Sequence, residues 1–190
     1  MKRSSIGIFF VLFAAPVLAM AQDCAPVAGI ENFGCVSPNI FRGAQPTEQD
    51  VRELARRGVK AIINLRDSDE KADMERKWAD SEGIRFYNIP FANWLGPKDE
   101  KVAEVLKLIN SSSDRPIFIH CKRGADRTGT VIAAYRISHD GWTAKDAKAE
   151  TKKYRFGWWQ FWMSDFIDDY YKKFGKPSAG SKPQERRKHP

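Results

Sequence analysis

Residues 117–129 read Ile-Phe-Ile-His-Cys-Lys-Arg-Gly-Ala-Asp-Arg-Thr-Gly, an apolar run followed by a short polar loop and a Thr-Gly pair. The apolar run predicts a buried strand over residues 117–120, and residues 128–139 predict a buried helix that Gly141 ends. A loop between a strand and a helix can point successive backbone N–H groups into one concavity, and the helix N-terminus adds partial positive charge. The segment therefore predicts a site for a tetrahedral dianion such as phosphate.

The loop also carries a nucleophile and a cation. Arg127 offers a bidentate contact to two phosphate oxygens, while loop N–H groups, the helix N-terminus and Arg127 favour the thiolate of Cys121. That thiolate would attack phosphorus and give a phosphocysteine, which water then hydrolyses. We expect Thr128 to donate its hydroxyl to the departing sulfur and His120 to orient the loop. The residues expected to surround the phosphate are Lys122, Arg123, Gly124, Ala125, Asp126 and Arg127, with Gly124 permitting the tight backbone.

Outside this segment, the mature chain alternates strand and helix signals. Strands are predicted over residues 40–42, 61–65 and 85–89, and helices over residues 47–57, 70–81, 99–110, 143–154 and 158–174. This alternation indicates an α/β fold with a central, mostly parallel sheet of four to five strands flanked by helices. Such sheets bind ligands at the carboxyl ends of their strands, where the polar loop lies.

The loop HCKRGADRTG resembles the phosphate-binding loop of the cysteine-dependent protein-tyrosine and dual-specificity phosphatases, whose signature is His-Cys-x5-Arg-Ser/Thr-Gly. The stretches IFRGAQP (residues 40–46) and INLR (residues 63–66) are similar to compact bacterial and atypical dual-specificity members, and the resemblance extends over roughly residues 36–172. It implies Cys121 as nucleophile, Arg127 as phosphate ligand and a reaction without a metal or other cofactor. No His, Cys or Asp cluster in the sequence has metal-ligand spacing either.

The proton donor to the leaving oxygen stays open between two aspartates. In most of the family it is an Asp on a separate loop well before the Cys, and residues 91–99 hold no Asp at the usual offset. Asp99 is the nearest, but a role as cap of the following helix competes and is slightly favoured. Asp126 resembles a loop Asp assigned as acid in some lipid and bacterial tyrosine phosphatases, although it can instead pair with Arg127 or a nearby lysine. Of the two, we favour Asp126 as the acid.

The sequence also leaves open which phosphate monoester is the substrate. Phosphotyrosine or dual-specificity protein substrates are expected, and phosphoinositides or inositol polyphosphates are the alternative, because Lys122 and Arg123 resemble the basic loops of enzymes that act on them. The aromatic run WWQFW (residues 158–162) is expected to pack in the core rather than form a recognition surface. Arg66 is expected to brace a loop through an ion pair rather than reach the site.

Three other classes compete with a phosphatase. A rhodanese-type sulfurtransferase also places a Cys in a loop after a strand, but its loop is shorter and lacks the Arg-Thr-Gly ending. A phosphate-binding module would hold phosphate without hydrolysing it, although both Cys121 and Arg127 are present. A thiol oxidoreductase fits poorly, because no second Cys lies near Cys121 in the sequence.

The N-terminal residues predict a segment that directs export, and the C-terminal residues predict a disordered tail. Lys2 and Arg3 precede an apolar run over residues 6–18 and a small-x-small pattern at residues 19–21, typical of a secretory signal peptide. A membrane anchor is the alternative, but the run is short for a span of about 20 residues. We therefore expect a signal peptide over residues 1–21, a phosphatase domain over residues 22–175, a basic disordered tail over residues 176–190, and a secreted, periplasmic protein without a stable membrane anchor.

Net charge and the cysteines limit which partners and cross-links the sequence predicts. The formal net charge of +8 comes mostly from the two ends of the chain, so we expect no nucleic-acid partner. The expected partner is a phosphorylated protein or a small phosphorylated substrate, and the oligomeric state is open. Cys24 and Cys35 are close enough in sequence for a disulfide in an exported protein, but the sequence does not establish whether they pair.

Overall fold

The computed structural model of the protein describes residues 24–91 and 96–175. Its centre is a five-stranded sheet in the order β1-β2-β5-β3-β4. The strands are β1 (Gly34–Ser37), β2 (Ile40–Gly43), β3 (Ala61–Asn64), β4 (Arg85–Asn88) and β5 (Ile117–His120). β1 pairs with β2 antiparallel, and the other pairings are parallel. The predicted α/β fold with a mostly parallel sheet is confirmed.

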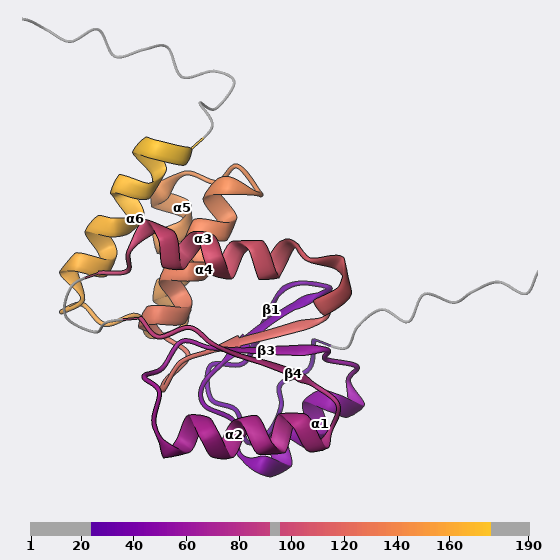
Figure 1. The fold of residues 1–190 in the computed structure, drawn as a ribbon. Coiled ribbons are helices and arrows are strands. Elements are labelled where there is room, and N and C mark those ends of the chain that lie inside the picture. Colours follow the sequence, from indigo (N-terminus) through magenta and orange to yellow (C-terminus); the bar gives the residue numbers. More distant parts are fainter. Residues whose placement is uncertain (1–23, 92–95, 176–190) are drawn as a thin grey trace, which may run out of the picture.

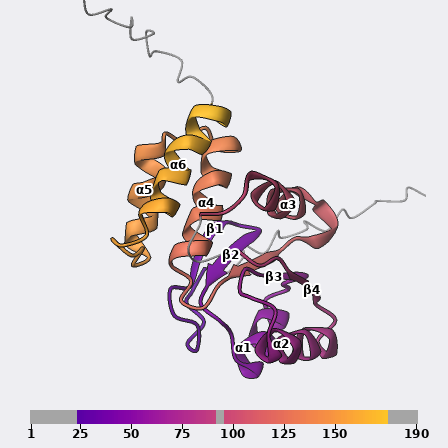
Figure 2. The ribbon, with the colours of Figure 1, turned by 60° about the vertical axis from the view of Figure 1, so that its left-hand side comes forward.

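Helices cover both faces of the sheet. One face carries α1 (Glu48–Arg56) and α2 (Glu70–Ser81), and the other carries α3 (Asp99–Asn110), α4 (Asp126–Ser138), α5 (Ala144–Lys153) and α6 (Phe161–Phe174) (Figures 1 and 2). Successive side chains of a strand point to opposite faces, so β5 contributes side chains to the hydrophobic cores on both faces of the sheet. Ile117 and Ile119 pack in the core under α3 and α4, whereas Phe118 packs in the core under α1 and α2.

Local sequence signals account for most element boundaries. Thr47 caps α1 in a capping box with Asp50, and Asp69 caps α2 by accepting from the Ala72 N–H. The predicted bounds of α2 and α3 are confirmed. α4 begins two residues earlier than predicted, and α6 begins at Phe161 rather than at residue 158. β1 was not predicted, because its four residues include only one that is buried, Val36.

The disulfide left open by the sequence is present. Cys24 and Cys35 are bonded, which ties the start of the described chain to β1. The predicted signal peptide and the predicted tail lie outside the described residues. Within residues 24–91 and 96–175, no helix is both long and apolar enough to span a bilayer.

Candidate active site

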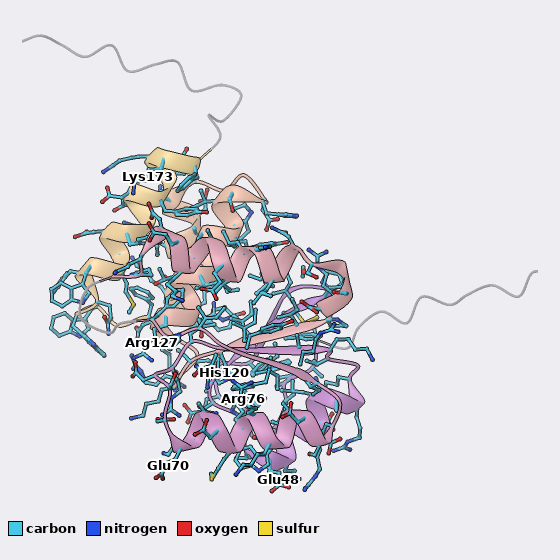
Figure 3. All side chains as sticks on the ribbon, in the orientation of Figure 1. Glu48, Glu70, Arg76, His120, Arg127 and Lys173 are labelled. Atoms are coloured by element: carbon cyan, nitrogen blue, oxygen red, sulfur yellow. A yellow bond between two sulfur atoms is a disulfide. The ribbon has the colours of Figure 1, made fainter. Side chains whose placement is uncertain are left out.

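A cavity of about 510 Å³ opens where the loops after β3 and β5 lie side by side, at the carboxyl ends of the parallel strands. Its volume is in the range of small-ligand sites. Figure 3 shows Arg127 at this end of the sheet and His120 closer to the middle of the molecule. The lining residues are Arg66, Asp67, Cys121, Lys122, Arg123, Asp126, Arg127, Trp159, Gln160 and Trp162.

Residues of β2 and of the loop that follows it pack against the loop between β5 and α4. Gly124 has φ +65°, and a Cβ there would lie 2.6 Å from the Ala44 backbone nitrogen, so a side chain has no room. The buried Arg42 donates from Nη2 to the Gly124 carbonyl at 2.6 Å, and its guanidinium lies 3.7 Å from the centre of the Tyr154 ring. Burial lowers the pKa of Arg42 to about 10, so it remains a cation near neutral pH beneath the loop.

A buried carboxylate on α2 supports His120, the residue before Cys121. Glu75 and His120 are both fully buried, with Oε1 and Nε2 2.8 Å apart, at an angle short of hydrogen-bond geometry. The other Glu75 oxygen accepts from Asn64 Nδ2 at 3.1 Å and from Gln45 Nε2 at 2.7 Å. The Leu65 N–H donates to the His120 carbonyl at 2.9 Å. Glu75 therefore joins β3, β5 and the loop after β2, a role that the sequence analysis did not foresee.

Cys121 and Arg127 meet in the cavity, and both side chains are largely buried. Arg127 Nη1 donates to the Leu65 carbonyl at 3.4 Å, and Nη2 lies 3.6 Å from Asp67 Oδ2. These contacts hold the guanidinium against the loop that follows β3. Asp67, 70% exposed at its side chain, was missed by the sequence analysis, although it follows a predicted strand where ligand-binding residues are expected.

The two aspartates considered as acids lie in different places. Asp126 lines the cavity, where Oδ1 accepts from the Gly157 N–H at 2.7 Å and Oδ2 lies 2.5 Å from Arg123 Nη2. Asp99 is the first residue of α3, not its cap, and pairs with Lys173 at 2.7 Å. In Figure 3, Lys173 lies at the far end of α6 from Arg127. Asp99 is not among the lining residues, and the expected capping role is wrong because Lys98 precedes the helix.

Of the other loop residues expected at the phosphate, Lys122 lines the cavity, whereas Gly124 and Ala125 are not among its lining residues. Lys122 is exposed at the cavity, and Ala125 is buried directly before α4. The Thr128 hydroxyl is buried and has no hydrogen-bond partner among the residues that the structure describes. It is therefore free to donate to a neighbouring group. Within the described ranges, no group of three or more His, Cys, Asp or Glu side chains is arranged to hold a metal ion.

The expectation that the aromatic run 158–162 packs in the core is wrong. Trp158 is 80% exposed and Phe161 is 56% exposed, while Trp159 and Trp162 are about half exposed and line the cavity. The physical reason is the register of α6, whose buried residues are Met163, Ile167 and Tyr170 at helical spacing. That face packs on the core and turns the aromatic run outward.

Arg66 combines the two roles that the sequence analysis set against each other. It lines the cavity, and it braces the loop through an ion pair with Asp69 at 3.1 Å. Its Nη1 also donates to Gln45 Oε1 at 2.7 Å, which connects it to the Glu75 contacts.

Comparisons with known proteins agree with this arrangement. The sequence model of a family described as "DSP-PTPase phosphatase fused to NAD+ Kinase" matches residues 35–168. The chain is 31% identical over 123 residues to the dual specificity protein phosphatase TpbA of Pseudomonas aeruginosa, covering 64% of this chain and 54% of that protein. It is 30% identical over 112 residues to inositol diphosphatase DSP4 of Arabidopsis thaliana, covering 55% of this chain and 54% of that protein.

The chain thus spans about half the length of these curated relatives. Among solved structures, a crystal structure of Pseudomonas aeruginosa TpbA with its cysteine changed to serine, in complex with phosphotyrosine, superposes with a TM-score of 0.62. The two are 26% identical, and the alignment covers 83% of this chain and 98% of the TpbA chain.

Proposed function

The chain belongs to the family of cysteine-dependent dual-specificity and tyrosine phosphatases, and on that premise we propose that it hydrolyses phosphate monoesters through a phosphocysteine on Cys121. One observation carries the proposal. The buried Cys121 shares a cavity with Arg127 at the N-terminus of α4, on a loop held in shape by Arg42 and the left-handed Gly124. The cavity thus combines a nucleophile with groups that bind a phosphoryl dianion.

The reaction proceeds in two displacements at phosphorus. The Cys121 thiolate forms the S–P bond as the ester P–O bond breaks, and the departing oxygen takes a proton from an acid. Water then attacks phosphorus and returns a proton to that acid, the S–P bond breaks, and the thiolate and inorganic phosphate are released. Arg127 and the loop N–H groups hold the equatorial oxygens in both steps, and the Thr128 hydroxyl donates to the sulfur as it leaves.

For the acid, Asp126 is our first choice, because it lines the cavity and Asp99 does not. Both Asp126 oxygens accept hydrogen bonds from Gly157 and Arg123, so one of these must open before the carboxyl can donate to the leaving group. Asp67 is a further candidate. It also lines the cavity, and one of its oxygens lies beside Arg127.

We propose phosphotyrosine or dual-specificity protein substrates. The half-exposed Trp159 and Trp162 rings line the same cavity as Cys121, which suits an aromatic ester. The likeness to the TpbA complex with phosphotyrosine supports the same choice. Inositol phosphates are the second candidate, because Arg66, Lys122 and Arg123 add cations to the cavity and one relative is an inositol diphosphatase.

We further propose that the protein works in the periplasm. The export pattern of residues 1–21 and the disulfide between Cys24 and Cys35 support this location, because disulfides persist in oxidising compartments. Cell fractionation with the full chain tests it, and recovery in the cytoplasm with residues 1–21 still attached would contradict it.

The proposed activity is tested by phosphate release from phosphotyrosine peptides, phosphoserine peptides and inositol polyphosphates under reducing conditions. We expect Cys121→Ser to lower turnover by about 10³-fold or more and Arg127→Ala by at least about 10²-fold. The control is Arg56→Ala, since Arg56 is exposed and its one ion pair within the described part of the chain is with Glu53 on the same helix. If phosphate binds but none is released from any substrate, the protein is a binding module instead.

A further inference from the structure

Four aromatic side chains form an exposed ridge beside the mouth of the cavity. The ridge consists of Trp158, Trp159, Phe161 and Trp162, which lie in the loop before α6 and in its first turn. Their rings form two edge-to-face pairs, with centroids 5.8 Å and 6.5 Å apart. In Figure 3, ring side chains at the lower end of α6 project from the outline of the molecule, on the same side as Arg127. Clustered exposed apolar side chains mark interaction sites.

Neither folding nor the cavity accounts for the whole ridge. α6 packs on the core through Met163, Ile167 and Tyr170, so the ridge is not needed to seat the helix. Trp159 and Trp162 line the cavity, but Trp158 and Phe161, the two most exposed members, do not. A substrate held within the cavity would therefore leave these two rings in water.

Cations lie beside the ridge where it borders the cavity. The Arg123 guanidinium lies 5.4 Å from the centre of the Trp159 ring. Lys122 and Arg155 are exposed, and the side chains of both lack an ion-pair or hydrogen-bond partner within residues 24–91 and 96–175. The first turn of α6 carries no acidic residue, and the exposed Asp165 in the next turn is the nearest carboxylate along the helix. The exposed carboxylate at the mouth, Asp67, lies next to Arg127.

We propose that the ridge docks the protein on the surface of an anionic phospholipid bilayer. Indole and phenyl rings are favoured at the membrane–water interface, and flanking Lys and Arg are attracted to anionic headgroups. The ridge projects outward, which suits a bilayer surface, whereas an extended peptide needs a groove or a sheet edge. Because Trp159 and Trp162 belong both to the ridge and to the cavity, docking turns the cavity mouth towards the headgroups.

This orientation has a consequence for substrates that rests on the proposed function. Phosphate esters held at the bilayer surface would be reached in preference to the same esters free in solution, because docking raises their effective concentration at the mouth. The docking itself does not depend on hydrolysis, so the two are tested separately.

The test is co-sedimentation of the exported form, residues 22–190, with vesicles of phosphatidylcholine, with and without phosphatidylglycerol. We expect binding to the mixed vesicles that weakens as salt is added, together with a blue shift of tryptophan fluorescence. Trp158→Ser and Phe161→Ser should each weaken binding about tenfold, the change expected for partly burying one aromatic side chain. Met74→Ser is the control, because Met74 is 46% exposed on α2 across the sheet. Thermal melting checks that every variant is folded.

Three results would overturn the docking proposal. They are absence of binding to mixed vesicles, equal binding by the ridge variants, and equal weakening by Met74→Ser. If the ridge variants instead lose affinity for a phosphotyrosine peptide while vesicles are not bound, the ridge is a protein-docking surface. Phosphate release from a soluble ester is measured on the same preparations. A failure to hydrolyse therefore counts against the proposed function and not against docking.

Discussion

Replacing Glu75 with Gln removes one negative charge from a fully buried position and keeps the shape of the side chain. Two charge-assisted hydrogen bonds, from Asn64 and Gln45, become neutral ones and lose about 1 kcal/mol each. The contact with His120 also loses its charge, and the new amide turns an N–H group towards one of the surrounding donors, which costs about 1 kcal/mol or more. We therefore expect the free energy of unfolding to fall by about 2–4 kcal/mol.

Urea denaturation measures this loss, with the slope of the transition compared between variants to confirm that the denatured states are alike. The control is Glu70→Gln, because Glu70 lies exposed in the first turn of the same helix, as Figure 3 shows. Glu70→Gln should lower the free energy of unfolding by no more than about 1 kcal/mol. Turnover should fall in Glu75→Gln, since His120 directly precedes Cys121, the proposed nucleophile. A stability loss no larger than that of the control would refute the argument that Glu75 holds the loop.

Three further predictions concern the loop, the acid and the disulfide. Gly124→Ala should lower the free energy of unfolding by about 2 kcal/mol or more and abolish most activity, because a Cβ there has no room. Gly83 is also at positive φ but lies in open space, so Gly83→Ala should lower the free energy of unfolding by only about 1 kcal/mol. Equal losses of stability in urea would contradict the argument that Gly124 is crowded. Asp126→Asn should slow esters with poor leaving groups more than activated ones, and the same pattern in Asp67→Asn alone would move the acid to Asp67. Cys35→Ser removes the disulfide to Cys24 and should lower the free energy of unfolding by about 3 kcal/mol. This difference between the variant and the unaltered protein should vanish when both are measured under reducing conditions.

The core of the site was readable from the sequence because its parts are neighbours along the chain. Residues 117–129 contain the strand, the loop and the start of the helix, so apolar periodicity and a helix N-terminus were enough to place Cys121 and Arg127 together. The same local signals predicted α2 and α3 to the residue. They also predicted a mostly parallel sheet, because strands and helices alternate along the chain.

What the sequence determined by itself was therefore the loop that carries Cys121, the cation within it and the class of fold. The tertiary structure decided which distant side chains meet that loop. Arg42 reaches the Gly124 carbonyl across 82 residues, and Glu75 reaches His120 from a helix on another part of the chain. It also placed Asp67 beside Arg127 and turned Trp158 outward. Such contacts depend on strand order and helix register, which arise from packing of the whole chain and leave no signature in the local pattern of residues.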